Sequence, residues 1–371
     1  MNDREGSPCE QVENEPSDNE SSHGVCLCES WEASDAGGEG LMVGPCFACT
    51  RRKELTSEHI VPHALGGRLK GLLYCKECND RFGKEIDAEI SKQFGKIATL
   101  LNIKRERGGE TRPFDVREIS TGTELVFDGK GFTRKGVIVN LSSKDGKKLD
   151  AADITVRSKG ELKKTCAEIR KRYEVSGEMK EFQEHHPGPT DAVHETEINS
   201  RLLRRASAKI AYSFLCTKVS RDIVLSSAFD GIRAYIKDDE GPDLSCANYV
   251  HTRFMTDHVR PLHKVHVALN RDDKIVVGYV SLFGMYRFTV VLSDDFVSDL
   301  EWADLDYTFD PVRLQEVFML GNERLRGSHI TRADILNPKQ SKELVEAEIS
   351  RGHEVVATYV DGYEFLHGEV E

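Results

Sequence analysis

The sequence has no long hydrophobic run. Nowhere in its 371 residues is there a stretch approaching the ~18 to 20 consecutive apolar residues that a membrane-spanning helix requires. Its first residues are acidic, whereas a secretory signal begins with basic residues and continues with apolar ones. We therefore expect a cytoplasmic protein with no membrane partner.

Basic residues are outnumbered over the whole chain, with 51 Lys and Arg against 63 Asp and Glu, so the formal net charge is -12. Taken alone, this acidity argues against a nucleic-acid partner, because Lys and Arg supply the attraction to phosphate. The acidity is concentrated, however, in residues 1–45, where eleven carboxylates face a single basic residue, Arg4. Between positions 51 and 112, Lys and Arg outnumber Asp and Glu. An acidic tail is thus followed by a basic segment that is suited to nucleic acid.

Large apolar residues are almost absent from residues 1–43, so this segment cannot offset the entropy cost of folding. We predict a disordered acidic tail there. Composition and turn signals divide the rest into a compact module at 44–95, a mixed α/β region at 96–175, a linker or loop at 176–192, and an α+β C-terminal domain of unknown role at 193–371.

Hydrophobic periodicity predicts the helices and strands of an α+β protein. Strands are predicted at 124–127, 136–140, 265–269, 274–280 and 286–292, and helices at about 159–174, 202–215 and 223–236. The residues Asn270-Arg-Asp-Asp273 favour a turn, so the strands on either side are expected to form a hairpin. The C-terminal half is expected to combine a helix pair with an antiparallel sheet.

Cysteine is too sparse for a disulfide scaffold, at ten residues in the chain, but four cysteines form two close pairs. Cys46, Cys49, Cys75 and Cys78 give C-x2-C, twenty-five intervening residues and a second C-x2-C. Two-residue spacers place both sulfurs of a pair on one side of a tight knuckle, and four thiolates close the tetrahedral shell of one structural zinc ion. Unlinked thiols or disulfides are the alternative interpretations. The other six cysteines are assigned no role.

Two motifs accompany these cysteines. Between the pairs lies Glu58-His-Ile-Val-Pro-His-Ala-Leu-Gly-Gly67, and directly after the last cysteine comes Asn79-Asp-Arg-Phe-Gly-Lys-Glu-Ile-Asp87. Over about residues 46 to 90, this order resembles the HNH endonucleases with a ββα-metal fold, especially the subgroup with zinc knuckles. The resemblance implies a small zinc-stabilised ββα module that cleaves DNA. It also implies that Glu58 and Asn79 hold one catalytic divalent cation, Mg²⁺ or Mn²⁺, and that His59 deprotonates the attacking water.

Elementary chemistry requires the same residue types. Hydrolysis of a phosphodiester needs an activated water, a base, and a cation that neutralises charge on the phosphate and the leaving oxygen. A neutral imidazole is a base near pH 7, and Mg²⁺ prefers oxygen ligands and keeps several waters. Glu58 and His59 are neighbours on a presumed strand, so their side chains diverge and could serve the metal and the water separately.

The resemblance also covers the turn and the helix that surround the proposed catalytic residues. Gly66 and Gly67 allow a tight turn between the two strands, and Asn79 is expected to begin the helix that closes the site. The family's middle asparagine, which orients the catalytic histidine, should lie shortly before Cys75, where this chain has Lys70-Gly-Leu72. His63 is interpreted as a surface histidine, with a role facing the phosphate as the alternative.

Three basic residues are candidate nucleic-acid contacts. In related modules the helix after the second cysteine pair lies in the minor groove, so Arg81 and Lys84 could contact phosphate, together with Arg68 in the same basic segment. A solvated helix face is the alternative for the first two. The expected substrate is double-stranded DNA.

Two rival functions remain open. A zinc-ribbon protein could bind nucleic acid without cutting it, although such a protein has no use for Glu58, His59 and Asn79 at this spacing. An RNA-directed nuclease is the other rival, because the chemistry attacks any phosphodiester and nothing here reads the 2′-hydroxyl.

A second acidic-His-Pro string, at 257–261, is followed by His263 and His266 but by no Gly-Gly turn or Cys-x2-Cys-Asn. We expect no second active site there, and we expect both histidines at polar strand positions that face solvent. The C-terminal sequence is compatible with DNA recognition, signal sensing or a homodimer interface, and it does not choose among them.

Overall fold

The computed structural model describes residues 42–104, 112–135, 138–143, 147–156, 159–175, 192–193, 199–241, 245–247, 260–297 and 304–318. Nearly all of the predicted acidic tail and of the predicted linker at 176–192 lies outside these residues. Within the described ranges, no helix has the length and apolar character needed to span a membrane. Helices and mostly antiparallel strands are mixed along the chain, which confirms the α+β fold class.

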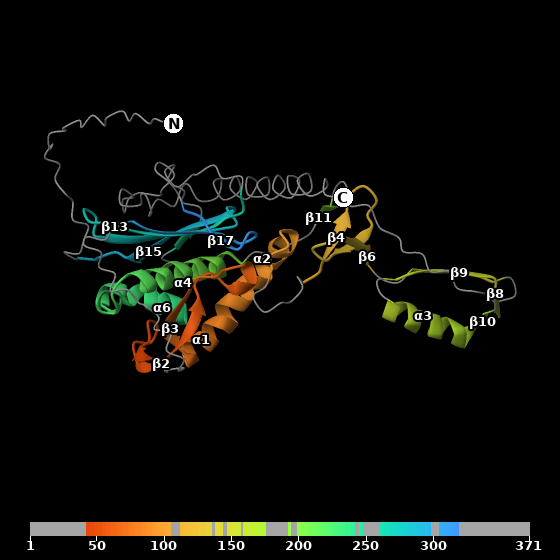
Figure 1. The fold of residues 1–371 in the computed structure, drawn as a ribbon, viewed down its shortest axis with the longest axis horizontal. Coiled ribbons are helices and arrows are strands. Elements are labelled where there is room, and N and C mark those ends of the chain that lie inside the picture. Colours follow the sequence, from red (N-terminus) through yellow and green to blue (C-terminus); the bar gives the residue numbers. More distant parts are fainter. Residues whose placement is uncertain are drawn as a thin grey trace, which may run out of the picture. The chain divides into compact units, whose positions relative to one another are not determined.

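The cysteine-rich segment folds as a strand hairpin followed by a helix (Figure 1). Its elements are β1 (Val43–Pro45), β2 (Arg52–His59), the 3-10 turn η1 (His63–Leu65), β3 (Lys70–Cys75), α1 (Lys76–Phe82), the π-helical turn η2 (Gly83–Asp87) and α2 (Ala88–Leu100). The strands pair antiparallel in the order β1-β2-β3. The expectation that Asn79 begins the helix is wrong. The helix begins at Lys76, because the second cysteine knuckle is itself the first helical turn.

Two glycines shape the loop between β2 and β3 for different reasons. Gly66 has a φ of +92°, in the left-handed region that favours glycine. At Gly67, an added Cβ would lie 1.9 Å from the carbonyl oxygen of Val61. The tight turn predicted at this pair is confirmed, and it depends on the absence of both side chains.

Short strands and one helix follow α2. They are β4 (Phe114–Glu118), β5 (Glu124–Phe127), β6 (Phe132–Arg134), β7 (Ile138–Ser142), β8 (Lys148–Leu149), β9 (Ala151–Thr155), α3 (Lys159–Arg172), β10 (Glu174–Val175) and β11 (Ala192–Val193). A four-stranded sheet has the order β11-β4-β5-β6, while β7 pairs with β9 and β8 with β10. The strand predicted at 124–127 and the helix predicted at 159–174 are confirmed. The strand predicted at 136–140 appears as β7, and positions 136 and 137 lie outside the described residues.

The next region is helical. It contains α4 (Ser200–Lys218), α5 (Arg221–Val224), the 3-10 turn η3 (Ser227–Phe229) and α6 (Asp230–Asp238). The helix predicted from the apolar stripe at 202–215 is confirmed as α4, but the single helix predicted over 223–236 is wrong. Arg233 explains the break, because its guanidinium donates to the carbonyls of Val224, Leu225 and Ser226 at 2.8, 3.4 and 3.0 Å. These carbonyls are the acceptors that the end of a helix leaves unpaired.

A six-stranded antiparallel sheet forms the last described part. Its strands are β12 (Ser245–Ala247), β13 (His263–Asn270), β14 (Ile275–Leu282), β15 (Tyr286–Ser293), β16 (Leu305–Asp310) and β17 (Gln315–Glu316), in the order β12-β15-β14-β13-β16-β17. The three strands predicted here and the turn between the first two are confirmed.

The expectation that His263 and His266 face solvent is wrong, because their exposed fractions are 0% and 1%. His263 Nε2 lies 2.8 Å from the carbonyl oxygen of Leu65, and the ring of His266 pairs with Asp306. Hydrogen-bond partners on the ring nitrogens let a histidine occupy a buried strand position.

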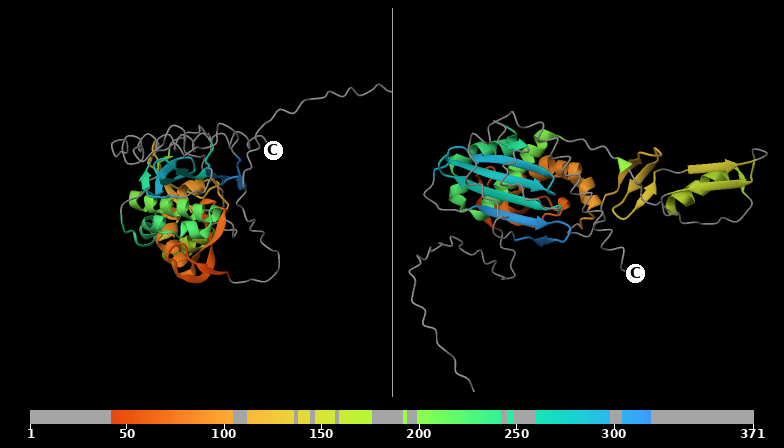
Figure 2. Two further views of the ribbon diagram at one scale, coloured as in Figure 1. Left: turned by 90° about the vertical axis from the view of Figure 1, so that its left-hand side faces the viewer. Right: turned by 90° about the horizontal axis from the view of Figure 1, so that it is seen from above.

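One cluster of buried apolar side chains joins the β2–β3 hairpin to the C-terminal sheet through α4. Figures 1 and 2 show α4 lying between the sheet and the β2–β3 hairpin. Polar contacts cross the same boundary. The hydroxyls of Tyr74 and Ser213 share a 2.6 Å hydrogen bond, and the Tyr212 hydroxyl donates to the carbonyl of Phe47 at 3.1 Å. The hairpin is therefore built onto α4 and does not stand apart from it.

Candidate active site and cysteine cluster

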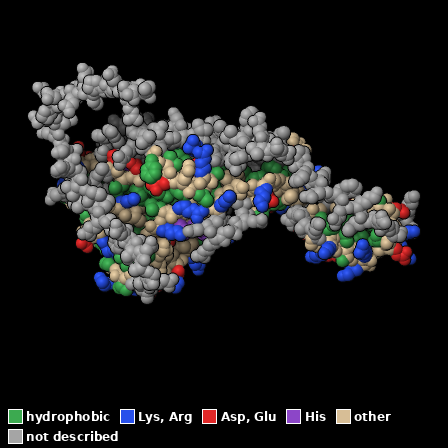
Figure 3. Space-filling model, in the orientation of Figure 1, with side chains coloured by type: hydrophobic (Ala, Val, Ile, Leu, Met, Phe, Trp, Pro, Cys, Tyr) green, Lys and Arg blue, Asp and Glu red, His purple; other side chains and the backbone are tan. Residues whose placement is uncertain are grey.

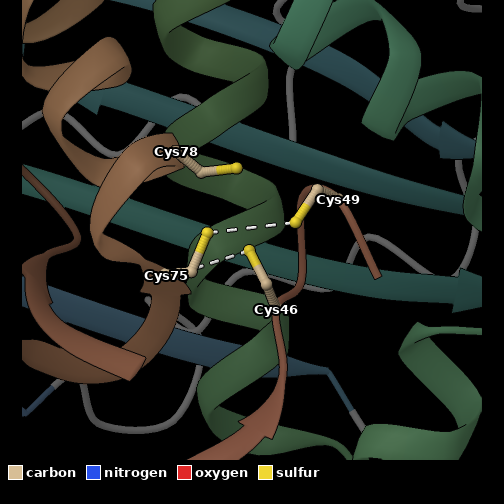
Figure 4. Close-up of side chains that lie close together, drawn as sticks. All are labelled: Cys46, Cys49, Cys75 and Cys78. Atoms are coloured by element: carbon tan, nitrogen blue, oxygen red, sulfur yellow. Dashed lines mark hydrogen bonds between the residues drawn. The ribbon is translucent and has the colours of Figure 1, made fainter. Parts of the chain in front are cut away.

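The four cysteines of the two knuckles lie together. Cys46 and Cys49 come from the turn between β1 and β2, and Cys75 and Cys78 from the junction of β3 and α1 (Figure 4). Their sulfur atoms all lie within 4.8 Å of one another. Cys49 Sγ is 3.9 Å from Cys75 Sγ, far longer than a disulfide bond of about 2.05 Å, and none of the four forms a disulfide. The group could therefore bind a metal ion.

The surroundings of the cluster favour a thiolate at Cys46, whose pKa is lowered, while the pKa values of Cys49 and Cys78 are raised. The backbone N–H of Cys75 donates to Cys46 Sγ at 3.3 Å. A hydrogen bond with Cys78 lowers the pKa of the Cys46 thiol to about 4, although burial opposes this shift. Over the described ranges, no other set of three His, Cys, Asp or Glu side chains brings its ligand atoms together. Four converging sulfurs fit the closed shell of a structural Zn²⁺.

Glu58 and His59 lie at the carboxyl end of β2. In the antiparallel register Glu58 is opposite Gly71 and His59 is opposite Lys70, after a bulge at Thr56 and Ser57. Glu58 is buried, with 8% of its surface exposed, whereas His59 is half-buried. The two neighbours thus differ in their access to solvent, as alternation along a strand requires.

Asn79 faces β2 from the first turns of α1. Its Nδ2 donates to Thr56 Oγ1 at 2.9 Å and to the carbonyl of Ser57 at 3.4 Å. The Thr56 hydroxyl in turn donates to the carbonyl of Tyr74 at 2.9 Å, so it can accept from Asn79. These contacts hold the amide with its nitrogen toward β2. Within the described part of the chain no hydrogen bond joins Asn79 to Glu58, and Asn79 Oδ1 is left for another ligand.

A buried lysine from α4 reaches the Glu58 carboxylate. Lys209 Nζ donates to Glu58 Oε1 and to both carboxylate oxygens of Asp87, at 2.7 and 2.6 Å. Burial raises the pKa of Glu58 to about 7, while Lys209 opposes that shift and Asp87 adds to it. Burial alone would lower the pKa of Lys209, but Asp87 and Glu58 reverse this and raise it. The three groups form one ionic cluster in which the ammonium stays charged.

Sequence reasoning missed Lys209 and gave Asp87 no role. A signal for Lys209 did exist. It lies within the apolar stripe of α4, three residues after Ala206 and three before Tyr212, where a charged side chain must be buried. Such a side chain needs a partner of opposite charge, but the sequence does not say which carboxylate supplies it.

A second histidine lies beside His59. The ring centroid of His63, in η1, is 5.4 Å from that of His59, and both side chains are half-buried. Lys70 and Leu72, at the place of the family's middle asparagine, are both exposed, and Lys70 lies directly across the hairpin from His59.

The three predicted nucleic-acid contacts differ in their surroundings. Arg81 donates to Glu85 at 3.0 Å and to Asp238 of α6 at 2.8 Å. Lys84 is exposed on η2, and Arg68 donates to the carbonyl of Lys104 at 3.5 Å. On the face drawn in Figure 3, Lys and Arg side chains form a group across the middle of the view. Of the three residues, Lys84 is the most available for phosphate.

Comparison with known proteins bears on the hairpin segment. Residues 46–95 match the family described as HNH endonuclease. No curated protein and no solved structure matches the chain. The match contains all four clustered cysteines as well as Glu58, His59 and Asn79. Residues 46–95 are thus similar to the HNH endonucleases, and this likeness suggests nuclease activity on a nucleic-acid substrate.

Proposed function

We propose that the chain is a metal-dependent endonuclease that hydrolyses phosphodiester bonds in double-stranded DNA. One observation carries the proposal: an HNH segment presents a half-buried histidine next to a buried carboxylate on β2, with an asparagine amide held against the same strand from α1. A protein that only bound nucleic acid would need the cysteine cluster and basic residues, but not this set.

His59 is the proposed general base. A neutral imidazole can take a proton from water near pH 7, and its place at the end of β2 leaves it partly open to solvent. The ring of His63 lies beside it and would steady it or face the phosphate. The water and the phosphodiester would approach from this half-buried side of the hairpin.

Glu58 and Asn79 are the proposed ligands of one divalent cation. Their available atoms are a carboxylate oxygen and Asn79 Oδ1, hard donors that suit Mg²⁺ or Mn²⁺. Bound there, the cation would stabilise negative charge on the phosphate and the leaving oxygen. The cysteine cluster is the proposed site of a structural Zn²⁺, which would tie the hairpin to α1.

Lys84, Arg68 and Arg81 are the proposed phosphate contacts. Arg81 would exchange part of its ion pairing with Asp238 for a phosphate. A cytoplasmic location is also proposed, because cysteine is too sparse for a disulfide scaffold and the four clustered cysteines suit a metal site.

The test is a cleavage assay on supercoiled plasmid with Mg²⁺ or Mn²⁺, comparing wild type with His59→Ala. Wild type should nick or cut the plasmid. Loss of the general base should slow cleavage by about 10²- to 10⁴-fold while DNA binding persists. Melting temperature and zinc content serve as controls for folding.

Equal activity of wild type and His59→Ala would contradict the assignment. DNA binding without cleavage in wild type would favour a binding protein. An RNA of the same sequence, assayed in parallel, distinguishes an RNA-directed nuclease.

A further inference from the structure

α4 brings one fully buried ammonium to the nuclease hairpin. The Lys209 side chain is 1% exposed, and its three N–H donors are matched by Glu58 Oε1 and the two carboxylate oxygens of Asp87. The ring of Phe82 lies on another side, with its centroid 6.0 Å from Nζ. With its donors used and its head group buried, Lys209 has nothing left with which to bind a phosphate.

We propose that Lys209 is a positioning residue of the nuclease site. It holds the Glu58 carboxylate through Oε1 and leaves Oε2 for the divalent cation, so this inference rests on the proposed function. Among the described residues, Lys209 is the only one that donates to this carboxylate. Both carboxylate oxygens of Asp87 accept hydrogen bonds from the Lys209 ammonium, and these bonds fix the position of the ammonium.

The charges explain why this position needs a lysine. Glu58 and Asp87 approach the same point from β2 and from η2, and their side chains are 10% and 19% exposed. Without the ammonium, two largely buried carboxylates would repel each other, and the Glu58 side chain would leave its present position. One positive charge between them reduces that repulsion, and when both carboxylates are ionised the cluster carries one net negative charge, which favours a cation nearby.

The backbone fixes the three members of the cluster from three elements. The π-helical turn η2 is wider than an α-helical turn, because its hydrogen bonds join residues i and i+5, and it ends on Asp87, which sets the direction in which that carboxylate leaves the helix. α4 is held against the hairpin by the Tyr74–Ser213 hydrogen bond, four residues beyond Lys209. The geometry of Glu58 is therefore decided by a helix that lies outside residues 46–95.

Lys209 could instead block the cation site, and a blocking role predicts the opposite effect of removing the lysine. If Lys209 occupied the cation's own place and blocked it, removing the lysine would strengthen metal binding and speed cleavage. A positioning lysine gives weaker metal binding and slower cleavage instead.

The experiment measures Mn²⁺ affinity and steady-state cleavage for full-length wild type and Lys209→Gln. Mn²⁺ binding at the proposed site is identified as the binding that is lost in Glu58→Gln. Lys209→Gln should bind Mn²⁺ about 10- to 100-fold more weakly, as loss of a group that orients a metal ligand generally does. It should lower kcat and leave KM for plasmid nearly unchanged, because Lys209 does not reach DNA.

The matched control is Lys218→Gln, an exposed lysine on the same helix that lies over the ring of Phe214 at 5.7 Å. It should leave Mn²⁺ affinity and kcat unaltered. Wild-type Mn²⁺ affinity in folded Lys209→Gln, or tighter binding with faster cleavage, overturns the positioning role.

If Lys209→Gln does not fold, Asp87→Asn tests the same cluster and leaves an electrically neutral Glu58–Lys209 pair. Asp87→Asn should also weaken Mn²⁺ binding, by a smaller factor than is expected for Lys209→Gln. Unaltered Mn²⁺ binding in Asp87→Asn overturns the inference. A folded wild type that neither binds Mn²⁺ nor cleaves refutes the proposed function itself, and this inference with it. Wild-type cleavage with unaltered variants refutes this inference alone.

Discussion

At the scale of single residues, neighbours in the sequence have different surroundings. Glu58 is buried against Lys209, while His59, next in the chain, is half-buried beside His63. A carboxylate held by an ammonium and a histidine with access to solvent can serve different steps of one hydrolysis. In the cysteine cluster, by contrast, four residues of the same type bring their sulfur atoms to one place, where they could bind one metal ion.

The cysteine cluster gives a prediction at this scale. Cys78→Ser should lower the zinc content from about one ion per chain and destabilise the hairpin, because a structural metal contributes folding free energy directly. Treatment with a strong chelator should have the same effect on wild type. Zinc analysis and thermal melting measure both.

The matched variant for this prediction is Cys166→Ser, in α3 and outside the cluster. It should keep the zinc and the wild-type melting temperature. Full stability of Cys78→Ser without zinc would show that the cluster is not a structural metal site.

At the scale of elements, the loop between β2 and β3 decides where β2, the strand of Glu58 and His59, ends. Gly66 turns the chain with a left-handed φ, and Gly67 lets the backbone pass close to Val61. Ile60 donates to the carbonyl of Leu69, which closes the hairpin beyond His59. The orientation of His59 therefore depends on a loop that contains no catalytic group.

Gly67→Ala tests the loop. An added Cβ would lie 1.9 Å from the Val61 carbonyl oxygen, so the backbone must move, and overpacking of this kind costs about 1 to 3 kcal/mol of unfolding free energy. Cleavage should fall as well, because His59 shifts with the loop. Denaturant unfolding and the plasmid assay measure the two effects.

Gly95→Ala is the matched control. Gly95 lies in α2, and an added Cβ there meets nothing within 4 Å. It should stabilise the protein by roughly 0.5 to 1 kcal/mol, because alanine favours a helix over glycine. Equal stability changes in the two variants would contradict the role given to Gly67.

At the scale of the molecule, the C-terminal sheet and α4 support the HNH segment from one side. α4 supplies Lys209 to Glu58, and β13 supplies His263 to the 3-10 turn η1. His263 Nε2 donates to the carbonyl of Leu65, and Nδ1 accepts from the N–H of Phe283 at 3.3 Å. This pattern requires the neutral ring.

A pH dependence of stability follows from that contact. Burial lowers the pKa of His263 to about 4, below its ordinary 6.5, although the Leu65 contact and Asp310 act in the opposite direction. Between these two values His263 binds more protons in the unfolded chain than in the folded one, so its contribution to stability falls as pH drops from 6.5 to 4. The loss from this one residue is at most about 3 kcal/mol.

His263→Gln should remove this contribution, since an amide can donate to Leu65 and accept from Phe283 without titrating, so the variant should gain stability relative to wild type as pH falls from 6.5 to 4. Urea unfolding at a series of pH values measures it. Burial lowers the pKa of His266, but Asp304 and Asp306 raise it above its ordinary value. His266 therefore changes the stability only above pH 6.5, outside the range in which wild type and His263→Gln are compared. An identical slope in wild type and variant would contradict this account.

The sequence by itself determined the local parts of this protein. The spacing of Cys46, Cys49, Cys75 and Cys78 predicted a cluster, and the Gly66-Gly67 pair predicted a tight turn, because both depend on geometry over a few residues. The strands from 265 to 292 and the helix at 202–215 were predicted for the same reason, since periodicity reports which face an element buries.

Only the tertiary structure decided which distant side chains meet. Glu58 and Lys209 are 151 positions apart, and Leu65 and His263 are 198 apart. No spacing rule reaches that far, so the sequence could not say that His263 is buried or that a lysine of α4 holds Glu58. The residues of the HNH motif can be read along the chain, but the burial of Glu58 and its contact with Lys209, which together shift its pKa, come from packing against α4.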